Sequence, residues 1–507
     1  MSVPAQAARG SRGRRGRLAS LIPDLLRERT FRRYWSAGTI SMFGDQVSSI
    51  ALPLTAVLTL HAGAAAMGYL IAALWLPSLL FAVHAGAWAD RFGRRRIIMI
   101  GADLGRAALL ASVPVCYALH VLTLAQLYGV AFGAGTLSTL FTVSDGSLSV
   151  AIMPDDQYVQ GSSLTNGSRA FSYVGGPSLG GLLVQLLSAP FAIAADSLSF
   201  LGSAFFLHRI RPKEAPAAPG GKGSLTVGVR FIVGSPIVRA SLIAASVINF
   251  FDFAFLALFV LYATRSLHVR PGLLGLVLGA GAVGGVIGSL ATRRVASRIG
   301  IGWAYVVGAV LFPAPLALVP LAGGPAPLVL GMLFLAEFLS GFGVMILDIS
   351  IGAIFAVVIP GELRSRVNGA FQAVNYGTRP LGAVVGGTLG TLIGLRPTLW
   401  IAAIGAATGF LWLLPSPLPR FRMPSAASDE AVTPESPSKP SQQPGSPQQP
   451  GSSQQPGSSQ QPGSSQQPGS SQQPGSPQQP APPDHSQPAP RQPAPCQAAP
   501  CQAAPRQ

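Results

Sequence analysis

Residues 66–96 read AMGYLIAALWLPSLLFAVHAGAWADRFGRRR. Up to Ala89 this stretch holds no Asp, Glu, Lys or Arg, and it is long enough to cross a bilayer as a helix, which takes about 20 mainly apolar residues. It ends in a short turn that contains Asp90 and several arginines. An apolar stretch of this length, closed by a brief charged turn, predicts a membrane-spanning helix.

The composition of the whole chain points the same way. Only 10% of the 507 residues are charged and 49% are hydrophobic, whereas a soluble protein has about 25% charged residues. The three cysteines lack the spacing of a zinc site or a disulfide scaffold, and the six histidines are scattered, so no metal site is predicted. The composition therefore argues against a water-soluble enzyme.

Apolar stretches recur throughout residues 34–415. They are uniformly apolar rather than alternating, which excludes a transmembrane β-barrel. We predict an all-α integral membrane fold with twelve transmembrane helices, at residues 35–60, 66–89, 97–120, 122–150, 161–187, 190–209, 238–262, 272–292, 301–322, 326–357, 368–393 and 397–415.

The basic residues lie mostly on one side of these predicted helices. If the N-terminus is cytoplasmic, residues 1–33 and 91–96 place their arginines in the cytoplasm, and only Arg265, Arg270 and Arg396 lie on the opposite side. This distribution follows the positive-inside rule, so the net charge of +17 does not indicate nucleic-acid binding. We predict a multi-pass protein of the cell membrane with both termini in the cytoplasm.

The last part of the chain has a different composition. From Thr433 onward there is no Val, Ile, Leu, Met, Phe, Trp or Tyr, and a QQPGS unit repeats between Gln442 and Pro480. Such a segment has no apolar surface to bury, so we expect it to be disordered. The predicted organisation is a basic N-terminal segment, two six-helix halves separated by a cytoplasmic linker, and a disordered cytoplasmic tail, at residues 1–33, 34–210, 211–237, 238–415 and 416–507 respectively.

The two predicted halves repeat each other. Asp252 follows Asp45 by 207 residues, and Pro360 follows Pro154 by 206. The glycines at 176, 180 and 181 recur at 382, 386 and 387. Two pseudo-symmetric halves are typical of carriers in which the substrate binds between the halves, near the middle of the membrane.

Several motifs resemble those of the major facilitator superfamily. The G-x-x-x-D-R-x-G-R-R pattern after the second predicted helix, G86-A-W-A-D90-R91-F-G93-R94-R95, is similar to its signature loop. The resemblance implies that the loop latches the cytoplasmic side in the outward-open state, through Gly86, Asp90, Arg91, Gly93, Arg94 and Arg95. The second-half copy has Thr292 at the position of Asp90, so the two halves are not expected to latch equally.

A second motif resembles one that the superfamily associates with export. It has the pattern G-P-x-x-G-G and comprises Gly176, Pro177, Gly180 and Gly181. Three further stretches are similar to the enterobactin-exporter and macrolide-efflux branch: F31-R-R-Y-W35 leading into G44-D-Q46, D103-x-x-R106-A107, and D196-x-x-S199-F200. The arginine often found at the start of span 4 in drug–proton antiporters is absent, since Gln126-Leu-Tyr-Gly129 stands there.

Ionisable residues inside the apolar spans indicate the transport pathway. Each costs about 2.5–3.5 kcal/mol on insertion scales at a helix centre, so each needs a partner or a water-filled cavity. Asp45 and Asp252 are the leading candidates for protonation or cation contact; the alternative is a permanent pair with Arg169 or Arg379. Glu337, Arg169 and Arg379 complete the predicted pathway. Asp103 and Arg106, three residues apart, are interpreted as a structural pair.

The predicted function is secondary active, proton-coupled efflux of amphiphilic small molecules such as antibiotics, siderophores or secondary metabolites. The chain has no phosphate-binding loop and no Ser/His/Asp or Cys/His grouping, so we predict neither an enzyme nor a cofactor. The expected partners are the substrate, protons and the lipid bilayer, and the protein is expected to be a monomer. The alternatives are an importer or facilitator of a polar solute, or a non-transporting receptor or scaffold.

Overall fold

The structure is a computed structural model, which describes residues 24–153, 157–211 and 225–423. Every regular element in these ranges is helical. The longer helices are α3 (Arg29–Leu54), α4 (Ala64–Phe92), α5 (Arg95–Ala118), α6 (Leu124–Ile152), α7 (Tyr158–Leu187), α8 (Ala189–His208), α9 (Leu225–Gly234), α10 (Pro236–Arg265), α11 (Pro271–Ile299), α12 (Ile301–Leu311), α14 (Ala326–Val358), α15 (Arg364–Leu392) and α16 (Leu395–Ala407). The short elements are α2 (Asp24–Arg27), α13 (Leu318–Leu321), a π-helical turn at Thr55–Thr59, and 3-10 turns at Ala314–Ala317, Gly361–Leu363, Thr408–Trp412 and Leu418–Arg420.

The helix boundaries follow local sequence rules. Thr123 precedes α6 and its side chain accepts a hydrogen bond from the backbone N–H of Gln126, at 3.3 Å. Pro236 and Pro271 open α10 and α11, where a missing N–H is not needed by the helix. Gly300 separates α11 from α12 with a φ of 87°, a conformation that glycine adopts without strain.

Nine helices of the described residues are long and apolar enough to cross a membrane. Three of the twelve predicted spans, 35–60, 368–393 and 397–415, are not among them. The helices at the first two positions, α3 and α15, are long, but they include charged residues and many polar ones. At the third position, α16 has 13 residues before the chain tightens into the 3-10 turn at Thr408–Trp412.

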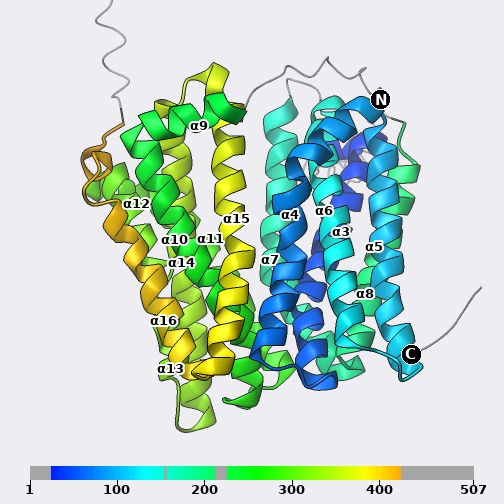
Figure 1. Cartoon of the computed structure of the whole chain (residues 1–507). Helices are drawn as coiled ribbons and strands as arrows, with labels where there is room; N and C mark the ends of the chain where they lie inside the picture. Colours follow the sequence, from blue (N-terminus) through cyan, green and yellow to red (C-terminus); the bar gives the residue numbers. More distant parts are fainter. Residues whose placement is uncertain (1–23, 154–156, 212–224, 424–507) are drawn as a thin grey trace, which may run out of the picture. The chain divides into compact units, whose positions relative to one another are not determined.

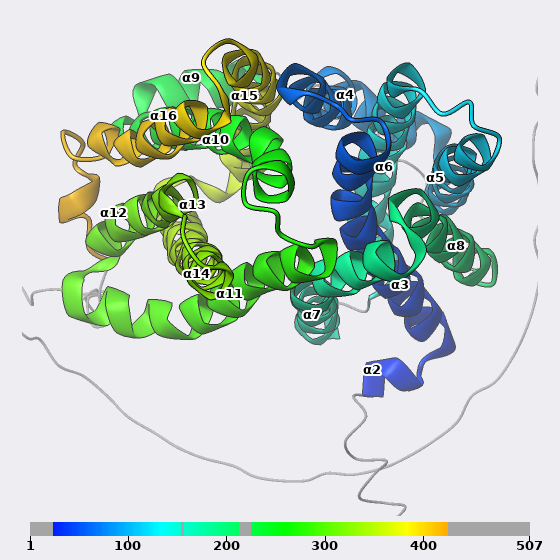
Figure 2. The same ribbon diagram turned by 90° about the horizontal axis from the view of Figure 1, so that it is seen from below.

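The helices pack into two sets. Helices α3 to α8 pack on one another, as do α9 to α16, and the sets meet where α4 packs on α15 and α7 on α11 (Figures 1 and 2). We call these two meeting lines the α4–α15 seam and the α7–α11 seam. Helix α9 falls within the predicted linker and packs on α15 and α10.

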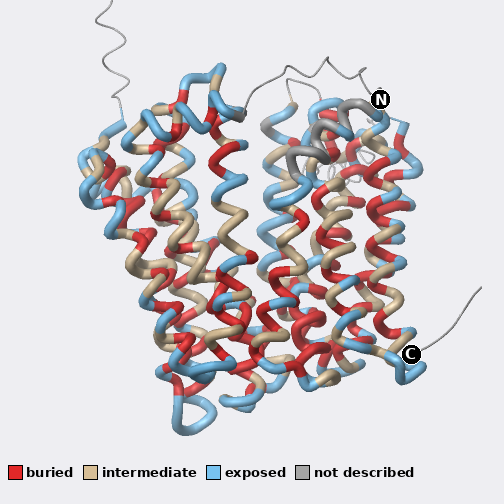
Figure 3. Tube along the Cα trace, viewed as in Figure 1, coloured by how far each residue is buried: buried red, intermediate tan, exposed pale blue. Residues whose placement is uncertain are grey.

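The apolar cores are arranged differently at the two ends of the helices. At the end where α3 finishes and α4 begins, one core includes residues of both sets, among them Leu54, Met67, Leu258 and Leu333. At the other end each set has its own core, around Phe31 in one and around Tyr305 in the other. We call the first end the closed end and the second the open end. Figure 3 shows many buried residues at the closed end, at the bottom of the view.

Two glycine contacts join the sets near the closed end. On the α4–α15 seam, a Cβ atom added to Gly68 would lie 2.9 Å from the Cα of Gly387. On the α7–α11 seam, a Cβ atom added to Gly181 would lie 2.9 Å from the Cα of Gly275. The sequence repeat relates these positions. Gly275 follows Gly68 by 207 residues, and Gly387 follows Gly181 by 206 residues. Both seams therefore depend on glycine for the close approach of their backbones.

Candidate substrate cavity

A cavity of about 2610 Å³ lies between the two sets of helices. Its walls come mainly from α3, α4, α6 and α7 of the first set and from α10, α11, α14 and α15 of the second. The lining reaches from Pro53 and Leu70, beside the shared core, to Tyr34 and Trp35 near the start of α3. The cavity thus extends from the closed end toward the open end.

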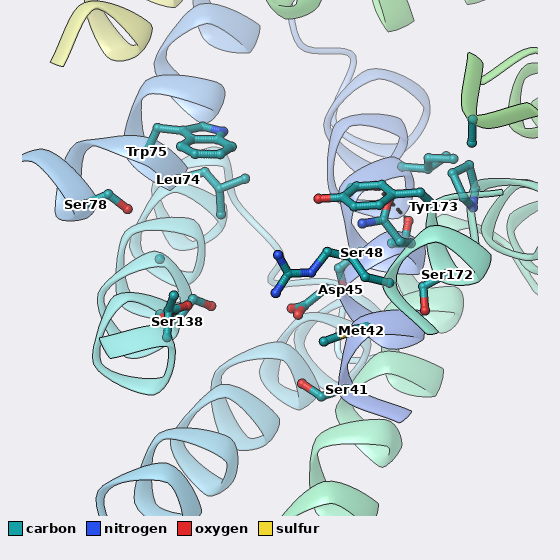
Figure 4. A pocket seen from close by; sticks show the side chains of 18 of the residues that line it. Ser41, Met42, Asp45, Ser48, Leu74, Trp75, Ser78, Ser138, Ser172 and Tyr173 are labelled. Atoms are coloured by element: carbon teal, nitrogen blue, oxygen red, sulfur yellow. Dashed lines mark hydrogen bonds between the residues drawn. The ribbon is translucent and has the colours of Figure 1, made fainter. Parts of the chain in front are cut away.

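Asp45 lines this cavity on α3. Figure 4 shows Asp45 and Tyr173 on one side of the space that Trp75 and Ser138 face from the other. One carboxylate oxygen of Asp45 lies 3.6 Å from the guanidinium group of Arg106, and the Asp45 side chain is 47% exposed. The partner of Asp45 is therefore Arg106 of α5, and not Arg169 or Arg379, the two arginines that the sequence offered as alternatives.

Arg106 is the centre of a buried network. Its guanidinium group forms an ion pair with Asp103, one turn earlier in α5, and lies 3.3 Å from the hydroxyl of Ser138. Its guanidinium carbon lies 4.6 Å from the ring centre of Phe141 and 4.0 Å from that of Phe200. The pair with Asp103 agrees with the structural interpretation from the sequence. In addition, Arg106 itself lines the cavity and connects the buried Asp103 to Asp45.

Asp196 of α8 belongs to the same region. Its carboxylate accepts hydrogen bonds from the hydroxyl of Ser48 and, at 3.0 Å, from that of Ser199. Asp196 and Phe200 come from the stretch D196-x-x-S199-F200, and Phe200 stacks on Arg106 of D103-x-x-R106. Two motifs that are distant in the sequence therefore meet at one site. Asp196 was absent from the predicted pathway, and the D196-x-x-S199-F200 motif was the signal that could have included it.

Arg379 of α15 lies on the α4–α15 seam. It donates a hydrogen bond to the side-chain oxygen of Asn249, at 3.0 Å. Aromatic rings surround its guanidinium carbon, which lies 4.1 Å from the ring centre of Tyr376, 4.5 Å from that of Trp75 and 5.0 Å from that of Phe253. Trp75 and Tyr376 line the cavity, whereas Arg379 does not.

The remaining predicted pathway residues are distributed unevenly. Glu337 on α14 and Arg169 on α7 line the cavity, and neither forms an ion pair with a described residue. Asp252 on α10 is not among the lining residues. The repeat therefore relates Asp45 and Asp252 in sequence, but only Asp45 reaches the cavity.

The signature loop connects α4 to α5. Gly86, Asp90 and Arg91 belong to α4, and the surroundings of these three positions lie outside the described part of the structure. Gly93 has a φ of 65° and follows the last residue of α4, and Arg94 and Arg95 begin the turn into α5. The neighbouring Arg96 donates a hydrogen bond to the carbonyl oxygen of His208 at the end of α8, at 3.1 Å.

The G-P-x-x-G-G motif lies on α7 between two helices. Gly176 packs against Gln46 and Gly180 against Val47, both on α3. The carbonyl oxygen of Pro177 and the backbone of Gly181 instead approach Gly275 on α11. The motif therefore holds α7 close to a helix of its own set and to a helix of the other set.

Comparison with known proteins identifies the family. Residues 19–443 match the family described as transmembrane secretion effector. The chain is 27% identical over 376 residues to YfiS of Bacillus subtilis (strain 168), an MFS-type transporter, a match that covers 70% of this chain and 86% of YfiS. It is 26% identical over 406 residues to the multidrug efflux pump Tap of Mycolicibacterium fortuitum, which covers 76% of this chain and 94% of Tap.

Solved structures share the fold. The nucleoside transporter NupG superposes with a TM-score of 0.61 at 13% identity, covering 76% of this chain and 98% of that one. An inward-facing bacterial homologue of the iron transporter ferroportin gives a TM-score of 0.59 at 15% identity, with 78% and 99% covered. The predictions of a major facilitator protein and of a non-enzyme are confirmed. The chain belongs to the transmembrane secretion effector family of the major facilitator superfamily, and it is a multi-pass membrane transporter.

Proposed function

We propose that this transporter is a proton-coupled exporter of amphiphilic small molecules. The observation that carries the proposal is the cavity of about 2610 Å³ between the two sets of helices, closed at one end by the shared apolar core. A cavity much larger than a sugar or an ion, with apolar and polar walls, suits a large amphiphilic substrate. The name of the relative Tap, a multidrug efflux pump, supports the same direction and substrate class.

The proposed architecture has twelve spans in two pseudo-symmetric halves, 34–210 and 238–415. Helices α3 to α8 form the first half, and α10 to α16 form the second if α12 and α13 count as one span. The symmetry of the two glycine seams supports this division. Residues 211–237 link the halves, and residues 1–33 and 416–507 lie outside them. The protein functions as a monomer in the plasma membrane.

Both termini are cytoplasmic in this proposal, because the basic turns at the open end then follow the positive-inside rule. The open end faces the cytoplasm and the closed end faces the outside. A substrate enters the cavity from the cytoplasm, the halves part at the closed end, and the substrate leaves. The signature loop residues Gly86, Asp90, Arg91, Gly93, Arg94 and Arg95 then latch the cytoplasmic side, and Gly176, Pro177, Gly180 and Gly181 hold α7 in place during the exchange.

Asp45 is the proposed coupling residue. It is half-exposed to the cavity while its partner Arg106 is buried. A proton that enters from outside neutralises Asp45, weakens its attraction to Arg106 and so changes the relative stability of the two conformations. Asp252, Glu337, Arg169 and Arg379 are proposed to assist along the substrate and proton pathway.

Everted membrane vesicles test this function. The vesicles carry the protein and an imposed inside-acid pH gradient, and the uptake of fluorescent dyes and macrolides is measured against vesicles without the protein. We expect uptake that a protonophore abolishes. Uptake that ignores the protonophore would contradict proton coupling. If a parallel panel of polar solutes is taken up and the dyes and macrolides are not, the facilitator alternative is indicated.

A further inference from the structure

The two walls of the cavity differ in chemistry. The second set of helices presents mainly apolar side chains, with Ser289 and Ser340 as its lining hydroxyl residues apart from Tyr376. The first set is rich in serine and threonine, with eleven such residues in the lining.

Most of the hydroxyl groups in this wall that have a hydrogen-bond partner in the structure donate their proton to another atom of the protein. They donate to backbone carbonyl oxygens of their own helix, as in Thr139 to Gly135 at 2.9 Å and Ser172 to Ser168 at 2.9 Å. Ser49, Thr142 and Thr165 do the same. A hydroxyl group bound in this way can offer a substrate only its oxygen lone pairs. These five hydroxyl groups can therefore accept a hydrogen bond from a substrate in the cavity.

The charged side chains that line the cavity are also mainly negative. They comprise five carboxylates, at Asp45, Asp145, Asp196, Glu337 and Asp348, and two guanidinium groups, at Arg106 and Arg169. Arg106 is only 3% exposed and already contacts Asp45 and Asp103. Of the two guanidinium groups, only that of Arg169 therefore remains for an anionic substrate, and it faces an excess of carboxylates.

Glu337 is the carboxylate best placed to bind a ligand. It lies on α14 in the apolar wall, and no hydrogen bond or ion pair joins it to a described residue. One of its carboxylate oxygens would lie 3.3 Å from a Cβ atom at Gly281, so the absence of a side chain there leaves room beside the carboxylate. Leu278 and Met345 line the cavity on the same wall. A carboxylate in such surroundings is costly unless a cation accompanies it.

Ser340 provides an independent observation at the same place. It lies one turn after Glu337, lines the cavity and is 6% exposed, and its hydroxyl forms no hydrogen bond with a described residue. Residues three apart on a helix lie on the same face. The pair therefore offers a negative charge and an unused polar group side by side in an apolar wall.

We infer that the cavity selects amphiphilic cations, and that Glu337, assisted by Ser340, is the anionic residue that recognises their positive charge. The inference rests on the proposed export of amphiphiles and specifies which of them are carried. The apolar wall receives the hydrophobic part of the substrate, and the oxygen lone pairs of the opposite wall add to the negative potential.

The test compares two ions of the same shape and opposite charge. Equilibrium binding of tetraphenylphosphonium and of tetraphenylborate is measured on the purified full chain in detergent. We expect tetraphenylphosphonium to bind at least about tenfold more tightly, and Glu337→Gln to weaken its binding by about tenfold. Glu362→Gln changes an exposed carboxylate outside the cavity lining and should leave binding unchanged.

Glu337→Asp separates charge recognition from folding. It keeps the carboxylate and should retain most of the binding that Glu337→Gln loses, while gel filtration shows both variants folded. Equal binding of the two ions, no binding of tetraphenylphosphonium, or full binding by Glu337→Gln would overturn the inference. Vesicle uptake of neutral amphiphiles alone would leave the proposed export standing, whereas tetraphenylphosphonium binding without any uptake would overturn export and keep the cation site.

Discussion

The guanidinium carbon of Arg379 lies 4.5 Å from the centre of the Trp75 ring, and the contact crosses from one set of helices to the other. Arg379 belongs to α15 and Trp75 to α4, seven residues beyond Gly68, the glycine of the same seam. A cation over an aromatic ring contributes about 0.5–2 kcal/mol, depending on how far it is desolvated. The contact therefore stabilises the conformation in which this seam is closed.

Removing the ring should shift the protein toward the opposite conformation. We expect Trp75→Ala to reduce transport several-fold and to increase labelling of a cysteine introduced near the closed end. Trp75→Phe keeps a weaker aromatic partner for Arg379, so its transport and its labelling should lie between those of the wild type and Trp75→Ala. Unchanged labelling in Trp75→Ala would show that the contact does not bias the conformation.

The glycine seams predict a pair of equivalent variants. Gly68→Ala and Gly275→Ala each place a Cβ atom within 3 Å of the backbone of the facing helix, so both should destabilise the closed seam by about 1–3 kcal/mol. We expect similar losses of transport in the vesicle assay. The control is Gly331→Ala on α14, which has open space around it and should be neutral or slightly stabilising. Wild-type transport by both seam variants would contradict the role of the close approach.

Asp45 and Asp103 share Arg106 but should respond differently to mutation. Asp103→Asn leaves a buried guanidinium group without its main partner, at a cost of about 3–5 kcal/mol, and should lower the thermal unfolding temperature. Asp45→Asn changes a half-exposed carboxylate, so the protein should unfold near the wild-type temperature.

The same Asp45→Asn variant tests whether Asp45 couples transport to the proton gradient. Its uptake in everted vesicles should no longer respond to the pH gradient. Proton-driven uptake that persists in both Asp45→Asn and Asp252→Asn would contradict the assignment of coupling to Asp45 and the assisting role of Asp252.

Truncation of the chain after Met423 tests whether the tail takes part in transport. From Thr433 onward the tail has no large apolar residues to pack against the helices, so the shortened protein should insert and transport at the full-length rate. Vesicle uptake normalised to the amount of protein measures this. A loss of function in the shortened protein would favour the scaffold alternative.

The sequence predicted what depends on local pattern. Apolar stretches located the helices, and the three-residue spacing of Asp103 and Arg106 indicated their pair. The repeat aligned Gly181 with Gly387, and both approach a glycine of the facing helix in the structure. These features need only the period of a helix and the internal repeat of the sequence.

Contacts between side chains of different helices could not be predicted from the sequence. The spacing of residues along α3 and α5 does not indicate that Asp45 contacts Arg106. The spacing along α4 and α15 likewise does not indicate that Trp75 contacts Arg379. Each contact depends on how the helices rotate and cross. The repeat also does not predict which residues line the cavity, since Asp252 repeats Asp45 in the sequence but is not among the lining residues. The close approach of glycines recurs on both seams, whereas Asp45 and Asp252 differ in whether they line the cavity.

The shared apolar core at the closed end has an electrical consequence. If the cavity is filled with water from the cytoplasm, most of the membrane voltage falls across the apolar core that closes it, rather than evenly across the full bilayer. Moving one elementary charge through it then involves about 2.3 kcal/mol per 100 mV. A proton that reaches Asp45 from outside would cross most of that field, so the membrane potential itself would contribute to the driving force for each cycle.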